Sequence, residues 1–313
     1  MTTDTSLLQP ASTSGLAAAL RHSGSVAQAL QNAEVRVRQQ PGTFAERWQL
    51  FQWLCVMEDW PRALKQLQLA TQLTPDFAQT AHVYRDLIRA EVFRADVIKG
   101  AREPGALLSS PNWMTPLRNA LALAEAGDTD GADHYRQQAL SEVPDSSGAV
   151  DESRFDWIAD SDTRFGPTCE IISGGRYAWL PFAQLRKLEM RPVAGLLDLI
   201  WRSVTVTLVD GTVSHGFTPV RYPGSERESD ALQLARETHW SEVGETGIVA
   251  LGQKTWMTSA GAAAHSGYSY PSVAGALPGP VGRGVRVAGR AVHSVSIARD
   301  MAGDHLPASG GGR

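Results

Sequence analysis

Cysteine is scarce in this chain, since only Cys55 and Cys169 occur among its 313 residues. Disulfides are therefore not expected to hold the fold together, and two isolated thiols are typical of a protein kept in a reducing compartment. The sequence also lacks a run of the ~18 to 20 apolar residues that a membrane-spanning helix needs. The first thirty residues lack the basic start and the apolar stretch of a secretory signal. We therefore expect a soluble, cytoplasmic protein.

The chain also has no excess of positive charge. The 29 lysines and arginines are outnumbered by 33 aspartates and glutamates, which gives a formal net charge of −4 at pH 7. Proteins that bind nucleic acids or anionic membranes carry basic surfaces. We expect neither of these as the main partner.

Sequence signatures of catalysis and of ligand binding are absent. There is no GxSxG elbow, HExxH helix, CxxC pair or Walker A loop. The eight histidines are scattered, and none pairs with another histidine or a cysteine at the spacing of metal ligands. We therefore expect no metal, no cofactor and no catalytic activity.

The densest polar segment contains Asp160 and Asp162, and it leaves one enzymatic alternative open. Paired carboxylates can hold a hard cation or act as a general acid and base, so a metal-dependent hydrolase using these residues with His215 is possible. The segment lacks the glycine-bearing loop of an EF-hand. Helix-capping or hinge residues at a domain junction are therefore the favoured interpretation.

Three prolines show a regular spacing. Pro41 and Pro75 lie 34 residues apart and each follows an alanine- and leucine-rich stretch, while Pro144 lies 69 residues further on, about two such periods. An alanine recurs twelve positions before each proline, at Ala29, Ala63 and Ala132, and another recurs five positions before the last two, at Ala70 and Ala139. Small residues let two helices approach closely, and proline ends the second helix. A helix pair repeating every ~34 residues is typical of tetratricopeptide repeats, which present a surface to a partner.

The first part of the chain is predicted to be helical. Residues 1–13 are expected to form a flexible tail, and residues 14–144 a helical, tetratricopeptide-like repeat domain in the form of an α-α superhelix. Apolar residues at helical spacing predict the helices 44–57, 61–73, 75–100, 113–126 and 130–143. We expect Asp76 or a neighbour to cap the long helix 75–100.

The second part, residues 145–258, is predicted to be a small β-rich α+β domain with a twisted or partly closed sheet. Hairpins are predicted around Ser173-Gly174-Gly175 and around Asp210-Gly211, because alternating runs flank these turn residues. Residues 181–188 and 228–238 are expected to be helices, and residues 248–251 and 254–257 to be closing strands. The chain as a whole is thus expected to be a two-domain α+β protein.

Residues 259–313 differ in composition from the rest of the chain. They contain eleven glycines and no lysine or glutamate. Such a sequence buries too little apolar area to offset the entropy of ordering it. We expect a disordered or non-native tail, the latter if the reading frame changes in a GC-rich gene.

Five motifs, taken in order, resemble those of the ImpE/TagJ family, accessory proteins of the bacterial type VI secretion system. They are Tyr84–Glu91, Trp157–Pro167, Gly175–Phe182, Pro219–Ser225 and Asp230–Arg236 followed by Trp240. The resemblance covers about residues 14–258. It implies a non-enzymatic cytoplasmic adaptor that binds the N-terminal helix of the small sheath subunit. It also implies a link to the ClpV-type AAA+ ATPase that disassembles the sheath.

Binding of a helix in a groove depends on aromatic and arginine anchors. The resemblance therefore suggests eight candidate partner-binding residues: Tyr84, Arg85 and Arg89 on the long helix, and Trp157, Tyr177, Trp179, Arg221 and Tyr222 in the β domain. Each of them could instead pack in the core or between the domains. A repeat scaffold for an unrelated partner remains a further alternative.

Overall fold

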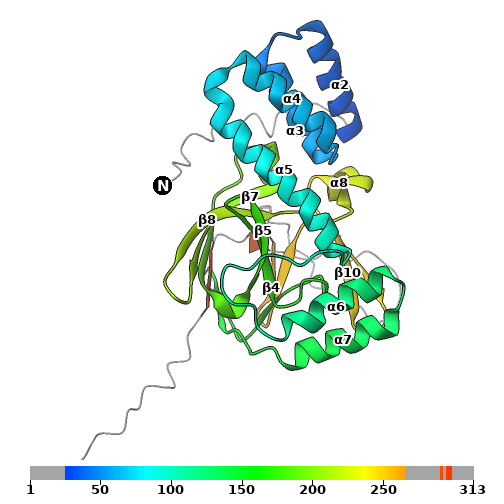
Figure 1. Cartoon of the computed structure of the whole chain (residues 1–313), viewed down its shortest axis with the longest axis vertical. Helices are drawn as coiled ribbons and strands as arrows, with labels where there is room; N and C mark the ends of the chain where they lie inside the picture. Colours follow the sequence, from blue (N-terminus) through cyan, green and yellow to red (C-terminus); the bar gives the residue numbers. More distant parts are fainter. Residues whose placement is uncertain (1–24, 152, 265–289, 292–293, 298–313) are drawn as a thin grey trace, which may run out of the picture.

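The computed structural model describes residues 25–151, 153–264, 290–291 and 294–297 (Figure 1). The predicted tail 1–13 and the start of the predicted helical domain lie outside these residues. The described part of the chain contains no helix long and apolar enough to cross a membrane.

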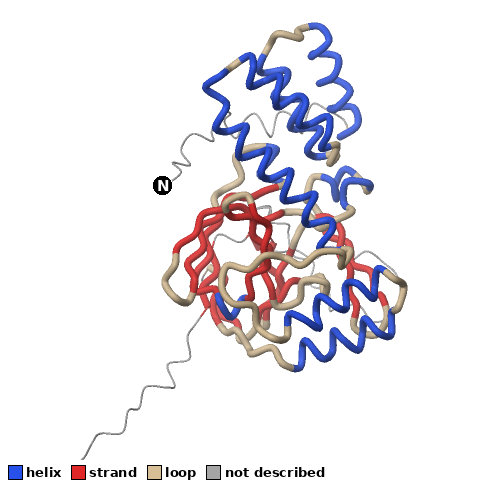
Figure 2. Tube along the Cα trace, viewed as in Figure 1, coloured by secondary structure: helices blue, strands red, loops and turns tan. Residues whose placement is uncertain are grey.

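The described part of the chain begins with four successive helices that pack against one another (Figures 1 and 2). The helices are α2 (Val26–Gln39), α3 (Phe44–Val56), α4 (Trp60–Leu73) and α5 (Ala78–Ile98). Asp59 caps α4 by accepting the backbone N–H of Arg62, and a proline occupies the first turn. The repeated alanines are buried, as expected: Ala29, Ala63, Ala70, Ala132 and Ala139. The helix pairs agree with the prediction, whereas their tetratricopeptide character remains a prediction.

The long helix α5 links the other helices to the sheet. The predicted helix 75–100 is divided, because Pro75–Phe77 form a 3₁₀ turn and α5 begins only at Ala78. Asp76 is therefore not the cap of α5, whose first turn has no side-chain cap. At the far end of α5 the pair α6 (Met114–Glu125) and α7 (Thr129–Ser141) lies beside the β strands (Figure 1). The domain boundary at residue 144 remains a prediction.

Most of the β domain is one eight-stranded sheet in the order β2-β1-β14-β6-β7-β8-β4-β5, with antiparallel pairing throughout. Its strands are β1 (Gly148–Val150), β2 (Ser153–Phe155), β4 (Thr168–Ser173), β5 (Arg176–Pro181), β6 (Leu185–Met190), β7 (Trp201–Leu208), β8 (Val213–Pro219) and β14 (Ser294–Ile297). The predicted hairpins β4–β5 and β7–β8 both form. Gly174 and Gly175 have φ of +56° and +73°, which is why glycines occupy that turn.

The remaining strands form two smaller sheets. One pairs β9 (Thr238–Val243) with β10 (Gly247–Gly252), and the other joins β13 (Arg290–Ala291), β12 (Gly261–Ala264), β11 (Thr255–Thr258) and β3 (Ile158–Asp160) in that order. The closing strands predicted at 248–251 and 254–257 correspond to β10 and β11. The chain is thus an α+β protein.

Two predicted helices are wrong in extent. In 181–188 only Phe182–Gln184 form a 3₁₀ turn, after which β6 pairs along β7. In 228–238 only α8 (Asp230–Gln233) is helical, because Ala235 adopts a φ of +51° and β9 begins at Thr238. In 181–188, strand pairing with the distant β7 and β14 overrides local helix propensity. In 228–238, the left-handed backbone at Ala235 and the start of the β9–β10 hairpin end the helix.

The prediction of an unfolded segment 259–313 is wrong for the residues of it that the structure describes. They form β12, β13 and β14, and β14 lies inside the main sheet between β1 and β6. Val295 of β14 is fully buried. The other residues of 259–313 lie outside the described part.

Candidate protein-binding site

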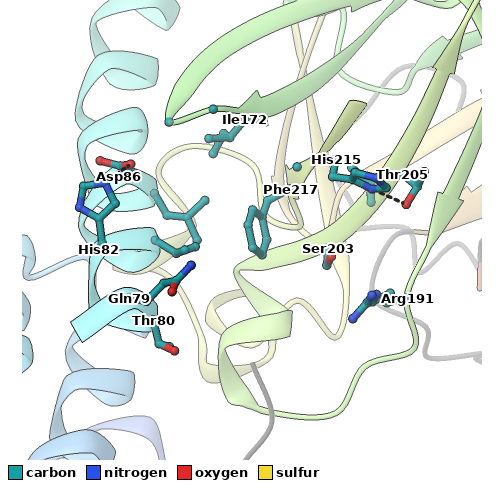
Figure 3. Close-up of a pocket in the computed structure, with 16 residues that line it drawn as sticks. Gln79, Thr80, His82, Asp86, Ile172, Arg191, Ser203, Thr205, His215 and Phe217 are labelled. Atoms are coloured by element: carbon teal, nitrogen blue, oxygen red, sulfur yellow. Dashed lines mark hydrogen bonds and ion pairs between the residues drawn. The ribbon is translucent and has the colours of Figure 1, made fainter. Parts of the chain in front are cut away.

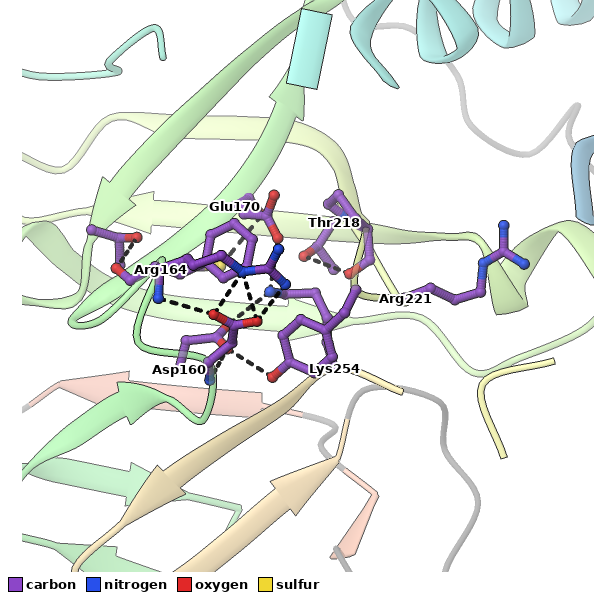
Figure 4. Close-up of polar contacts among 12 residues, drawn as sticks. Asp160, Arg164, Glu170, Thr218, Arg221 and Lys254 are labelled. Atoms are coloured by element: carbon purple, nitrogen blue, oxygen red, sulfur yellow. Dashed lines mark hydrogen bonds and ion pairs between the residues drawn. The ribbon is translucent and has the colours of Figure 1, made fainter. Parts of the chain in front are cut away.

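Charged side chains meet in the protein interior where α5 approaches the sheet (Figure 4). This buried ionic cluster consists of Glu91, Arg94, Asp160, Glu170 and Lys254. Arg94 reaches both oxygens of Glu170, with Nε–Oε1 and Nη2–Oε2 distances of 2.6 and 2.9 Å. The Nζ atom of Lys254 lies 2.7 Å from both Asp160 Oδ2 and Glu170 Oε2. Two cations and three carboxylates thus connect α5 to β3, β4 and the residue before β11.

The two carboxylates that face Lys254 respond differently to burial. Burial raises the pKa of Glu170, but the nearby Arg94 and Lys254 outweigh it and bring that pKa down to about 2. For Asp160 burial dominates, and its pKa rises to about 6 despite Lys254. The aromatic faces of Phe165 and Tyr222 lie 3.8 and 4.4 Å from Lys254 Nζ and stabilise the ammonium charge further.

Three of the predicted partner-binding residues belong to the surroundings of this cluster. The Tyr177 hydroxyl donates to Glu170 Oε1 at 2.6 Å, and the Trp179 indole donates to the Tyr177 oxygen at 2.7 Å. The Tyr222 hydroxyl donates to Asp160 Oδ1 at 2.7 Å. All three side chains are buried. Their polar atoms bond to other buried side chains. This favours a role in packing the core over direct contact with a partner.

Arg221 and Tyr84 also lie between the helices and the sheet. The Nη1 atom of Arg221 donates to the carbonyl oxygens of Val56 and Gln233, at 2.7 and 2.6 Å, and Arg221 is buried. The ring of Tyr84 packs within 6.3 Å, between centroids, of those of Trp48, Phe51 and Trp201. These residues hold the helices against the sheet.

The other three predicted residues are exposed. Arg85 and Arg89 lie on the solvent side of α5, and Trp157 is 42% exposed in the segment between β2 and β3. The structure does not bring Trp157 together with the two arginines in any contact among the described residues. Tyr84 is partly buried and the remaining four candidates are buried, so the partner-binding role of all eight remains a prediction.

A groove lies between α5 and the strands β4, β7 and β8 (Figure 3). Its volume is about 260 Å³, and its apolar floor consists of Val83, Leu87, Ile172, Val204 and Phe217. Polar side chains line both edges: Gln79, Thr80, His82 and Asp86 from α5, and Arg191, Ser203, Thr205 and His215 from the sheet side. Figure 3 shows Phe217 between these two edges.

Contacts within the groove fix its α5 edge. Arg89 Nη1 lies 3.1 Å from Asp86 Oδ1, which places one predicted residue at the rim. A Cβ atom on Gly175 would come within 3.0 Å of the Asp86 carboxylate, so the glycine lets the β4–β5 turn approach the helix. No sequence pattern indicates this groove, because the α5 residues and the strand residues that line it are more than 80 positions apart.

The carboxylates of the acidic segment bond to neighbouring side chains and backbone groups. Asp160 is bound to Lys254 and Tyr222, and the buried Asp162 carboxylate accepts hydrogen bonds from the guanidinium and the backbone N–H of Arg164 and from the backbone N–H of Ala250. Within the described residues, no group of three or more His, Cys, Asp or Glu could hold a metal ion. His215 lies apart from these carboxylates, on the groove wall, with its Nδ1 3.1 Å from Thr205 Oγ1.

The sequence and the fold of this chain are similar to those of known proteins. The model of the family described as ImpE protein matches residues 152–266. The type VI secretion system accessory component TagJ of Pseudomonas aeruginosa is 36% identical over 247 residues, which are 79% of this chain and 86% of TagJ. The crystal structure of protein VPA1032 from Vibrio parahaemolyticus has a TM-score of 0.77 and 22% identity, covering 91% of this chain and 98% of that one. At that identity the last match shows the fold alone. From the extent of the TagJ match and the family model, this chain belongs to the ImpE family.

Proposed function

We propose that this protein is a non-enzymatic, cytoplasmic adaptor of a type VI secretion system. In this proposal it binds the N-terminal helix of the small sheath subunit in the groove beside α5. It then assists the ClpV-type ATPase in disassembling or recycling the sheath. The relationship to TagJ supports the secretion role.

The shape of the groove is the observation that carries the binding proposal. An apolar floor between two polar edges suits an amphipathic helix, which buries apolar side chains while its flanks bond at the rim. Phe217 and Val83, which are partly exposed, supply apolar contact area, and Arg89 supplies an exposed charge beside the floor. Tyr177, Trp179, Arg221 and Tyr222 support the groove from within rather than touch the partner.

The proposal can be tested by calorimetric titration of the full chain with the N-terminal helix of the small sheath subunit, prepared as a peptide. We expect saturable one-to-one binding. Val83→Lys places a charge on the groove floor and should weaken binding by about tenfold or more, because the charge loses water on binding. Val92→Lys is the matched control on the same helix, since Val92 is 51% exposed and does not line the groove.

Two results would contradict the proposal. An absence of binding heat at high peptide concentration would remove the sheath helix as partner and favour a scaffold for an unrelated protein. Equal weakening by both lysine substitutions would place binding elsewhere on α5. Arg89→Ala and Arg85→Ala then compare the rim arginine with its neighbour outside the groove.

A further inference from the structure

The turn between α3 and α4, the C-terminal end of α5 and the segment leading into α8 contribute residues to a second cavity. Figure 1 shows α8 beside α5. The cavity has a volume of about 810 Å³, and it shares no lining residue with the groove beside α5. Met57, Trp60 and Ile98 form apolar walls. The cavity is therefore a separate site between the helices and the β domain.

One wall of this cavity carries a buried hydrogen-bond acceptor without a donor. Gln233 is 8% exposed, and its Nε2 atom donates to the carbonyl oxygens of Glu226 and Glu228, both at 3.0 Å. These two bonds fix the orientation of the amide. Its Oε1 atom is buried and has no partner among the described residues. An unpaired buried acceptor is costly, so a donor from outside the chain would be stabilising there.

Two carboxylates line the same cavity, and each is paired with an arginine through one oxygen. Glu226 accepts a bond from Arg227 Nε at 3.1 Å through Oε1, but its Oε2 atom is buried and meets no donor in the described part of the chain. Glu58 holds a left-handed backbone with φ of +54° and lies 3.1 Å from Arg221 Nη2. Burial raises the pKa of Glu58 to about 7, more than Arg221 lowers it.

We propose that this cavity receives the guanidinium or ammonium group of a basic side chain from a partner protein, with Glu58, Glu226 and Gln233 as acceptors. A guanidinium has five N–H donors and no acceptor, which complements a wall of unpaired oxygens. Trp60 can stack on it, and Met57 and Ile98 contact the aliphatic stem. Arg221 bonds to Val56, Gln233 and Glu58 through its Nη atoms. Lys99 and Arg227 also line the cavity, but within the described residues no cation donates to Glu226 Oε2 or Gln233 Oε1.

The test is an NMR titration of the ¹⁵N-labelled full chain with N-acetyl-arginine methylamide. The reporter is the indole N–H resonance of Trp60, assigned with Trp60→Phe. We expect a saturable shift with this probe and none with the neutral citrulline counterpart. Glu226→Gln should weaken binding by about tenfold or more, as a lost charge-assisted hydrogen bond predicts. Glu142→Gln, which removes an exposed carboxylate outside the cavity, should leave binding unchanged.

Three outcomes would overturn the inference. They are no saturable shift, an equal shift with the citrulline probe, and unchanged affinity in Glu226→Gln. Gln233→Met is the second variant if Glu226→Gln changes the rest of the spectrum, and it too should weaken binding. Val83→Lys should retain the arginine response, so failure of the groove proposal and failure of this one are distinguishable.

Discussion

At the scale of single residues, Lys254 carries a buried charge that the chain itself must balance. Its ammonium group is shielded from water and contacts two carboxylates and two aromatic faces. Each of those carboxylates has a further donor, from Tyr222 to Asp160 and from Arg94 to Glu170. Removing one partner from such a set leaves the other charges buried and unpaired.

We expect Lys254→Met to destabilise the protein by about 3–5 kcal/mol, the usual cost of breaking a buried ion pair on one side. Lys187→Met is the matched control, because Lys187 pairs with Glu189 on the surface, where both side chains are about half exposed. Its effect should stay within about 1 kcal/mol. Urea unfolding of both variants measures the difference, and equal stabilities would contradict the role assigned to Lys254.

The sequence identified residues of the right type at this scale but not their environment. Trp179 and Tyr177 were predicted as partner-binding anchors, yet they lie inside the protein. Aromatic and arginine side chains are suited equally to interfaces and to the junction of two packed units, so type alone does not separate the two. Lys254 was missed, although a lysine directly before a buried strand was a signal for a buried counter-charge.

At the scale of elements, one aspartate joins α7 to the β9–β10 hairpin. The Asp133 carboxylate accepts the backbone N–H groups of Glu245 and Thr246, at 2.7 and 3.1 Å, and pairs with Arg136 at 2.8 Å. The hydrogen bond from the Thr246 hydroxyl and these N–H bonds lower the pKa of Asp133 to about 2. Arg136 also donates to the Thr246 hydroxyl at 2.7 Å, so this pair of side chains fixes the hairpin on the helix.

We expect Asp133→Ala to destabilise the protein by about 2 kcal/mol at pH 7, because the freed N–H groups and Arg136 lose their acceptor. The lowered pKa means that this contribution is present above the unfolded pKa of about 4 and is lost as the pH falls toward 2. Denaturation at pH 7 and at pH 2.5 tests both statements. The difference in the free energy of unfolding between Asp133→Ala and wild type should be smaller at pH 2.5 than at pH 7. Asp130→Ala changes an exposed residue of the same helix and should have little effect at either pH.

Elements with strong local signals were predicted well, and those decided by distant pairing were not. The β4–β5 and β7–β8 hairpins have glycine turns and alternating runs, so their pairing is visible locally. The local sequence of residues 181–188 predicts a helix. It becomes strand β6 because β7 and β14 offer backbone partners on both sides.

At the scale of the whole molecule, β14 joins the first hairpin of the β domain to the rest of the sheet. Val150 lies opposite Val295, and Leu188 lies opposite the same residue on the other side. No short-range pattern could indicate a pairing across about 145 positions. The glycine-rich composition around β14 pointed instead to an unfolded tail.

We expect Val295→Asp to destabilise the protein by about 3 kcal/mol, because a charge replaces a fully buried apolar side chain. Undocking of β14 would also expose the backbone edges of β1 and β6, which favours aggregation. Ser296→Asp, the exposed neighbour on the same strand, is the control. Denaturant unfolding and light scattering should separate the two variants. Identical behaviour would mean that β14 does not stabilise the sheet.

The position of β14 has a consequence for biosynthesis. The hairpin β1–β2 leaves the ribosome more than 130 residues before β14, the strand that pairs with β1. The free edge of β1 therefore stays unpaired while the intervening chain is translated. Domains usually fold as units during synthesis, and unpaired strand edges in nascent chains are sites of misassembly. Premature termination of translation between residues 264 and 294 would therefore release a chain with all the described helices but without the strand between β1 and β6, a target for chaperones and proteases.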